Sequence, residues 1–263
     1  MHFLGFTTVQ ILWTLTFAAL LVLLVVLLGR DRARRFPWFT ASMVLTALRL
    51  LAERMLSGRM APITLGAIFL PLAAIEAFVC LLVAVEIARR AFSGARQRTW
   101  IFSTVAVLAV GAGVLATWGP WPAWKTVSTA SELGILRLIQ LIAQKTSLLS
   151  DVITIELGLL VVLFGRRFKA GWRSHTQKIV IGLSTASIAQ LATRGIWQLI
   201  ATHAAPQTQV EYEHVMGIQE KLYNATSLTF VAVLIWWIAC LWTNEPGTEV
   251  ATGTSNSAPA LPE

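Results

Sequence analysis

Residues Thr14–Gly29 read TLTFAALLVLLVVLLG, a run without a single charged side chain. A helix needs roughly 20 mostly apolar residues to cross the hydrocarbon core of a bilayer, and the residues just before this run complete that length. The segment lacks the basic start and the small-residue cleavage site of a signal peptide, and its apolar run is longer than a typical signal-peptide core. We therefore predict a first membrane span over residues 8–29 that is retained.

Six further segments meet the same requirement of length and apolar composition. The seven predicted spans run over residues 8–29, 38–56, 66–89, 99–118, 132–164, 178–201 and 221–242. Residues 1–242 are thus predicted to form an all-α, polytopic membrane helix bundle with seven transmembrane helices. Residues 243–263 are polar and rich in Pro, Thr, Ser and Ala, a composition that predicts a disordered cytoplasmic tail.

The overall composition agrees with a membrane protein. Of the 263 residues, 56% are hydrophobic and 13% are charged, whereas about a quarter of the residues of a soluble domain are charged. Mean hydropathy is +0.68. The chain has two cysteines, Cys80 and Cys240, both in apolar surroundings. This number is too small for a disulfide-rich secreted scaffold or for a metal site built from cysteines.

The net charge of +8 has a topological explanation. Thirteen of the 21 Lys and Arg residues lie in three alternate connections, residues 29–37, 89–98 and 165–178. Cytoplasmic loops of membrane proteins carry an excess of these residues, so we expect the N-terminus outside and the C-terminus in the cytoplasm. The charge gives no reason to expect nucleic acid as a partner. The compact loops favour a bacterial cytoplasmic (inner) membrane.

Ionisable residues inside the predicted spans are the strongest candidates for function, because each is costly in a bilayer unless it is paired or hydrated. Five of them fall in one layer, about 16–24 Å from the predicted cytoplasmic boundary. Arg49 can pair with Glu53 or Glu76, and Asp151 can pair with Arg194. The predicted intramembrane charged network comprises Arg49, Glu53, Glu76, Asp151 and Arg194; Arg54, Lys145 and Glu156 also lie inside spans.

Polar side chains follow one face of the fifth and sixth predicted spans. Their spacing of three and four residues places them on a single helical stripe, which faces protein or water rather than lipid. The predicted stripe comprises Gln140, Gln144, Ser147, Thr154, Ser187 and Gln198. It indicates either a polar cavity among the second, third, fifth and sixth spans or a closed network that holds the helices together.

Motifs of the common membrane cofactors and enzymes are absent from the sequence. No histidine lies inside a predicted span to ligate haem, and the HExxH, P-loop and GxSxG patterns do not occur. His203, Glu211, Glu213 and His214 fall in a predicted outer loop without fixed ligand spacing, and we expect them to be solvated. We predict no catalytic residue, no metal and no cofactor.

Three functions fit these observations. The first is a seven-helix sensor or receptor-like module for signal transduction, whose basic loops could dock a cytoplasmic or membrane protein partner; its ligand is unknown. Because only 21 residues follow Trp242, its output is expected to need a separate protein. The second is a small solute or proton-coupled transporter, because carrier sites commonly lie near the bilayer midplane. The third is a non-catalytic structural membrane subunit, whose partner besides the lipid bilayer is another protein.

Overall fold

The computed structural model describes residues 7–91, 107, 109–118, 132–164, 174–204 and 208–243. All regular secondary structure in these ranges is helical. The helices are α1 (Thr8–Gly29), α2 (Arg32–Arg35), α3 (Pro37–Leu56), α4 (Pro62–Ala91), α7 (Glu132–Phe164), α8 (His175–His203) and α9 (Gln209–Trp242). Residues 109–117 form a further helical segment. The predicted all-α class is therefore confirmed for the described part of the chain.

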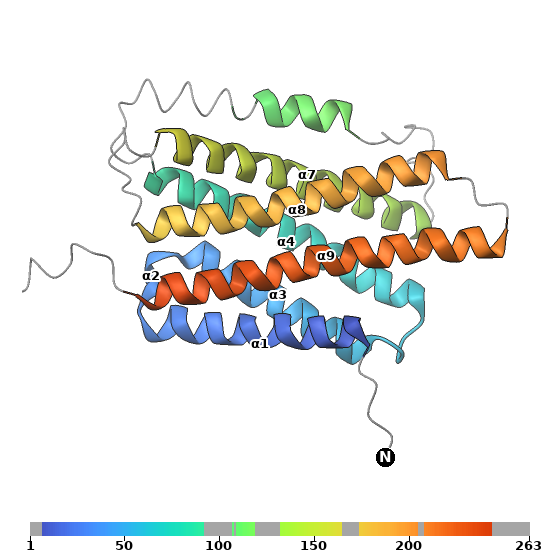
Figure 1. Ribbon diagram of the computed structural model, residues 1–263, viewed down its shortest axis with the longest axis horizontal. Helices are drawn as coiled ribbons and strands as arrows, with labels where there is room; N and C mark the ends of the chain where they lie inside the picture. The colour runs from blue at the N-terminus through green and yellow to red at the C-terminus, as the bar shows by residue number, and fades with distance from the viewer. Residues whose placement is uncertain are drawn as a thin grey trace, which may run out of the picture.

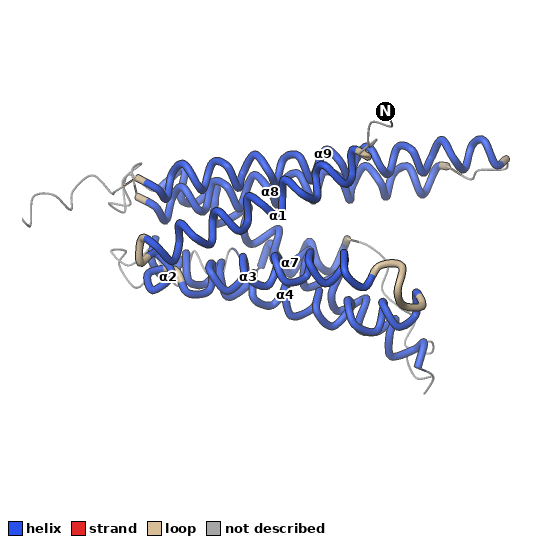
Figure 2. Tube along the Cα trace, turned by 90° about the horizontal axis from the view of Figure 1, so that it is seen from below, coloured by secondary structure: helices blue, strands red, loops and turns tan. Residues whose placement is uncertain are grey.

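In the part of the chain that the structure describes, six long helices lie side by side and form a closed ring. Around the ring, α1 contacts α3, α3 contacts α4, α4 contacts α7, α7 contacts α8, α8 contacts α9, and α9 returns to α1. Figure 1 shows that α1, α4, α7 and α9 run in one direction and α3 and α8 in the other. In Figure 2, α1, α8 and α9 form one layer, and α3, α4 and α7 form the second. The ring leaves room for a central space bounded by both layers.

One end of the bundle, which we call the basic end, contains arginines from the turn after α1, from α2 and from the end of α4. The C-terminal ends of α1, α4 and α9 meet there with α2 and the start of α3 (Figure 1). The Arg30 guanidinium lies 5.2 Å from the ring centroid of Trp242, and Arg32 donates a 3.5 Å hydrogen bond to the carbonyl of Thr243. These contacts fasten the end of α9 to the turn after α1. The other end, where α1, α4, α7 and α9 begin, is the distal end.

The apolar core fills the half of the bundle next to the basic end. Trp237 of α9 is fully buried there, and its ring packs edge-on against Phe39 of α3 at a centroid distance of 5.0 Å. The indole fits because residue 182 on α8 is glycine, since a Cβ at Gly182 would collide with Trp237. Other fully or nearly fully buried members are Leu20, Leu23, Leu27, Phe36, Ile87, Ile179, Val180, Leu234 and Leu241. Side chains from all six ring helices, including Leu157 and Val161 of α7, thus close this half of the ring.

A carboxylate of one helix caps the start of another at the basic end. Glu86 of α4 accepts hydrogen bonds from the backbone N–H groups of Trp38 (3.1 Å) and Phe39 (3.2 Å) in the first turn of α3. Its other oxygen accepts from Arg90 at 3.4 Å. Because the first N–H groups of a helix have no partner within the helix, Glu86 satisfies two of them. This contact fixes the start of α3 against the end of α4.

Within the described ranges, five helices are long and apolar enough to cross a membrane, namely α1, α4 from Thr64, α7 from Gly134 to Leu163, α8 and α9. They indicate a multi-pass membrane protein. Helix α3 occupies the predicted second span, but its last turns carry Arg49, Glu53 and Arg54, and it is not among the five. Residues 99–106 and 108 of the predicted fourth span lie outside the described residues, as does the tail from residue 244. The count of seven spans therefore stays a prediction.

The helix ends differ from the prediction mainly at α9. Residues 209–220 were expected in a loop but form the first turns of α9. A capping box explains this start, because Thr208 accepts from the N–H of Glu211 and the Glu211 side chain accepts from the N–H of Thr208. Helices α4 and α8 also extend a few residues beyond the predicted spans at both ends, whereas α1 and α7 have the predicted limits. Polar residues can continue a helix after it leaves the hydrocarbon layer.

Candidate functional site: a central charged cavity

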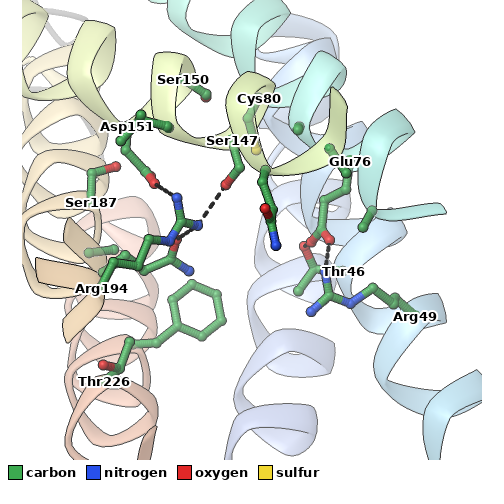
Figure 3. Close-up of a pocket in the computed structure, with 18 of the residues that line it drawn as sticks. Thr46, Arg49, Glu76, Cys80, Ser147, Ser150, Asp151, Ser187, Arg194 and Thr226 are labelled. Atoms are coloured by element: carbon green, nitrogen blue, oxygen red, sulfur yellow. Dashed lines mark hydrogen bonds and ion pairs between the residues drawn. The ribbon is translucent and has the colours of Figure 1, made fainter. Parts of the chain in front are cut away.

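A cavity of about 880 Å³ occupies the middle of the ring and extends toward the distal end. Its wall includes side chains from all six ring helices, together with Trp118. It reaches from Trp237 and Leu183, which adjoin the apolar core, to Val9 and Gln198 near the distal ends of α1 and α8. This volume lies in the range of about 300–1,000 Å³ that is typical of small-molecule sites. Figure 3 shows the side chains that face it.

The first charged cluster joins α3 to α4 in the cavity wall. The Arg49 guanidinium forms an ion pair with Glu76 through Nη1, and its Nε lies 3.2 Å from Glu53 Oε1, one turn along α3. The hydroxyl of Thr46 donates a 2.8 Å hydrogen bond to the other oxygen of Glu76. Glu76 is 15% exposed and Arg49 is 34% exposed. The carboxylate is thus held on both oxygens while part of the guanidinium still faces open space.

The second charged cluster joins α7 to α8 on the opposite side of the cavity (Figure 3). Arg194 Nη1 lies 3.2 Å from Asp151 Oδ2. Arg194 Nη2 donates to Ser147 Oγ at 2.8 Å and to Gln190 Oε1 at 3.2 Å. Ser187 lies beside the same aspartate. The Asp151 side chain is 11% exposed and that of Arg194 is 38% exposed, so the acid is buried and the arginine borders the cavity.

Most of the predicted site residues therefore meet around one space. Four of the five charged residues line it, and Glu53 stands behind Arg49 as its partner. Of the predicted stripe, Gln140, Gln144, Ser147, Ser187 and Gln198 line it as well. Both pairings proposed for Arg49 and the pairing of Asp151 with Arg194 are present. The two alternatives considered from the sequence, a cavity and a set of paired charges, occur together.

Thr154 does not line the cavity. It lies farther along α7, where its carbonyl accepts a 3.0 Å hydrogen bond from the hydroxyl of Ser184 on α8. Gly158 is one turn further, and a Cβ at this position would lie 2.8 Å from Ser184 Cβ and would collide with Ser184 Oγ. In this part of α7, the residues of the predicted stripe pack closely against α8 and do not border the cavity.

Several residues of the cavity wall were not identified from the sequence, among them Trp13, Thr46 and Tyr223. Trp13 of α1 lines the cavity and donates a 3.4 Å hydrogen bond from Nε1 to the Leu50 carbonyl. The Arg54 guanidinium lies over its ring, 5.9 Å from the ring centroid. Thr46 holds Glu76. Tyr223 of α9 also lines the wall. Their spacing within each helix gives no signal, because their role depends on which helices become neighbours.

Lys145 has a structural partner as well as a place in the wall. Its Nζ donates to the carbonyls of Leu115 at 3.3 Å and Trp118 at 2.5 Å, at the end of the helical segment 109–117. Basic side chains are favourable at this end of a helix, where unpaired carbonyls gather. The contact fastens this segment to α7 and leaves the positive charge of Lys145 beside the cavity.

The chemistry of this wall is suited to binding a polar or charged small molecule. It combines two arginines with spare exposure, two carboxylates, several amides and hydroxyls, and the aromatic rings of Trp13, Trp197 and Tyr223. Within the described residues, no group of three or more His, Cys, Asp or Glu side chains is placed to hold a metal ion. His203, Glu211, Glu213 and His214 lie at the end of α8 and the start of α9.

Comparisons of the chain with protein-family models, with curated proteins and with solved structures give no match.

Proposed function

We propose that this chain is a sensor or receptor-like membrane protein that binds a small molecule in the central cavity. The observation that carries this proposal is the position of the cavity. It extends from the middle of the ring toward the distal end, while a packed apolar core, which borders the cavity at Met43 and Trp237, fills the bundle at the basic end. A site that reaches one side and is closed toward the other suits a receptor.

The proposal includes seven spans with the basic end in the cytoplasm. Consecutive long helices alternate in direction or are separated by the segment 92–131 (Figure 1), which contains the predicted fourth span. Helix α3 has 20 residues, enough for about 30 Å. Its Arg49 pairs with Glu53 and Glu76, and its Arg54 lies over the ring of Trp13. Arginines at the basic end follow the preference of Lys and Arg for the cytoplasmic side. The distal end and the cavity then lie toward the outer side of the membrane. We propose that this membrane is a bacterial cytoplasmic membrane.

The second charged cluster gives the proposed receptor a route for its response. Arg194 belongs to the layer of α1, α8 and α9, and Asp151 belongs to the layer of α3, α4 and α7 (Figure 2). A ligand that accepts hydrogen bonds from the Arg194 guanidinium changes the contact between these layers. Helices α7 and α8 continue from this contact to the basic end. A cytoplasmic or membrane protein docked there could detect the change.

Transport is the second candidate, and one observation favours it. The two ion pairs lie part-way along their helices rather than at the ends, as do the sites of many carriers. A carrier also has to open the apolar half at the basic end. A purely structural subunit accounts for the ion pairs but not for a space of about 880 Å³ beside them.

Filling the cavity provides the experiment. A library of small polar molecules is screened for compounds that raise the unfolding temperature of the protein in lipid nanodiscs. Ala73→Trp on α4 and Ala186→Trp on α8 place an indole in the cavity wall from opposite sides. The matched controls are Ile75→Trp and Ile188→Trp, because both isoleucines are more than half exposed on the same helices.

The proposal expects compounds that stabilise the parent protein and both control variants but neither cavity-filling variant. If the stabilising compounds act equally on all five proteins, or if no compound acts on the parent, the proposal is wrong. The compounds that bind are then tested in proteoliposomes. Their accumulation inside the vesicles identifies a transporter, and binding without accumulation identifies a receptor.

A further inference from the structure

We infer that the ligand of the cavity is a small organic anion with one carboxylate group on an apolar body. This inference rests on the proposed function and names the chemical class of its ligand. It follows from the sum of the charges in the cavity wall, from the fixed orientation of Arg194, and from two amides that lie one turn along the same helices.

The charged residues of the cavity wall leave one positive charge in excess. Among the described residues that line the cavity, three are basic and two are acidic, namely Arg49, Lys145 and Arg194 against Glu76 and Asp151. A charge inside a membrane protein is costly unless a counter-charge or water compensates it. A ligand with one negative charge supplies that compensation.

The side formed by α3 and α4 is balanced. In the described part of this side, the charged residues of the wall are Arg49 and Glu76, and they form an ion pair. Glu53 and Arg54 stand behind this pair, outside the wall, and their charges are also opposite. The Arg54 guanidinium already lies over the ring of Trp13, so this aromatic face is occupied. This side therefore attracts neither a cation nor an anion strongly.

The excess positive charge belongs to the side formed by α7 and α8. Asp151 pairs with Arg194, and Lys145 adds a second cation less than two turns from Asp151 along α7. Carbonyls of Leu115 and Trp118 accept from its Nζ, and these groups are neutral. Both cations border the same space, so an anion is attracted to this side of the cavity.

The Arg194 guanidinium is oriented before a ligand arrives. Asp151 holds Nη1, and Ser147 and Gln190 accept from Nη2. The side chain is still 38% exposed, so part of the guanidinium can donate to a ligand. Figure 3 shows this group between its partners at the cavity. A guanidinium in a fixed orientation binds a carboxylate or a phosphate group well.

Two amides of the wall can add hydrogen bonds to the same anion. Gln144 lies one turn from Ser147 on α7, and Gln198 lies one turn from Arg194 on α8; both line the cavity. Among the hydrogen bonds between described residues, none involves either side-chain amide. Each amide carries two N–H donors. An anion beside Arg194 therefore has neutral donors within reach on both helices.

The rest of the wall selects a carboxylate on an apolar body. A carboxylate carries one negative charge at pH 7, whereas a phosphate monoester carries nearly two and would reverse the imbalance. Neighbouring helices contact each other all round the ring, so the tail of a phospholipid would have to pass between two of them. The apolar body is suited to the leucines and phenylalanine of the wall, which are Leu12, Leu50, Leu70, Leu141, Leu148, Leu183 and Phe230.

Four probes with a chain of six carbon or nitrogen-terminated atoms test the inference. They are hexanoate, with one negative charge, hexanamide, its neutral analogue, hexylamine, a cation, and hexanedioate, with two negative charges. Binding to the full chain in lipid nanodiscs is measured by calorimetry, with empty nanodiscs as the blank. Hexanoate is expected to bind at least about tenfold more tightly than each of the other three, since one hydrogen-bonded ionic contact is worth about that factor. Butanoate and octanoate then report the length of the apolar body.

Variants assign the anion to its side of the cavity. Arg194→Gln and Lys145→Gln each remove the excess charge and are expected to lower the affinity for hexanoate while that for hexanamide stays the same. A loss of structure would weaken both probes together. Arg194→Lys keeps the charge if Arg194→Gln does not fold, and it is expected to retain the preference for hexanoate over hexanamide. Arg137→Gln, an exposed position on α7 outside the cavity wall, is the matched control and is expected to change nothing.

A variant of the balanced side tests the count of charges. Glu76→Gln raises the excess in the wall from one positive charge to two and leaves Arg49 without one of its carboxylates. Hexanedioate is then expected to bind at least as tightly as hexanoate, which reverses the order in the parent protein. A purely structural role of Glu76 would not reverse the order of two anions.

Four results overturn the inference: equal or tighter binding of hexanamide, hexylamine or hexanedioate by the parent, no binding of butanoate, hexanoate or octanoate, an unchanged preference in Arg194→Gln and Lys145→Gln, and an equal loss in Arg137→Gln. The proposed function fails separately. If an uncharged or cationic compound stabilises the parent protein but not Ala73→Trp or Ala186→Trp, the cavity is a binding site and only the anionic class is wrong.

Discussion

Arg194 and Asp151 form an ion pair, with Nη1 3.2 Å from Oδ2, that joins α8 to α7 in the wall of the central cavity. The two residues lie 43 positions apart in the sequence, and the pair connects the two layers of the bundle (Figure 2). The aspartate is the more buried partner, and the arginine is shared with Ser147 and Gln190. The pair therefore has a structural role and at the same time presents a guanidinium to the cavity.

The energetic coupling of this pair is the first prediction. Arg194→Gln leaves the buried carboxylate of Asp151 without its cation, and we expect it to destabilise the protein more than the double variant Asp151→Asn/Arg194→Gln. A double-mutant cycle is expected to give a coupling of about 1–3 kcal/mol. Unfolding in mixed micelles with increasing SDS measures each free energy. Strictly additive effects of the two substitutions contradict the assigned pair.

Close packing of α7 on α8 gives the second prediction. Gly158→Ala introduces a Cβ that would collide with the Ser184 side chain, and overpacking of this kind costs about 1–3 kcal/mol. Adding Ser184→Gly removes the obstructing atoms and is expected to restore part of the loss. Gly66→Ala is the matched control because nothing lies within 4 Å of its Cβ, so its effect on the unfolding free energy is expected to be small. Equal losses at positions 158 and 66 would count against this packing.

The cap that Glu86 provides for α3 gives the third prediction. Glu86→Ala leaves the N–H groups of Trp38 and Phe39 without their acceptor, and loss of a helix cap costs about 0.5–2 kcal/mol. Glu86→Gln keeps an acceptor oxygen and is expected to lose less. Hydrogen exchange of the first turn of α3 should accelerate in Glu86→Ala before the rest of the helix is affected. A uniform change along α3 would show that the carboxylate does not act as its cap.

Periodicity within a helix accounts for the part of the site that was predictable. Gln140, Gln144, Ser147 and Asp151 share one face of α7 because their spacing matches the helical repeat, and all four line the cavity. The same reasoning placed Thr154 with them. Thr154 instead lies beyond the cavity, where α7 and α8 are in tight contact. The apolar run of the first span and its last residue, Gly29, were also evident from composition.

Contacts between helices distant in the sequence account for what could not be predicted. Thr46 reaches Glu76 only because α3 and α4 are antiparallel neighbours. Glu86 lies one turn from Arg89 and Arg90 in the sequence, and nothing in that spacing indicates that its carboxylate accepts hydrogen bonds from the start of α3. The cavity itself depends on closure of the ring between α1 and α9, and no pattern within a single helix specifies that closure.

The central claim is that the cavity is open to water from the distal, outer side and closed toward the basic end. The two native cysteines test it directly, because Cys80 lines the cavity and Cys240 is buried in α9 near the basic end. Sealed vesicles of one orientation are treated with a membrane-impermeant, charged methanethiosulfonate. The variant Cys240→Ser retains only Cys80, and we predict that the reagent modifies it from the outer side. The variant Cys80→Ser retains only Cys240, and we predict that the reagent does not modify it. Neither variant is expected to be modified from the basic side. Protection of Cys80 from the outer side, or its modification from the basic side, would contradict the account.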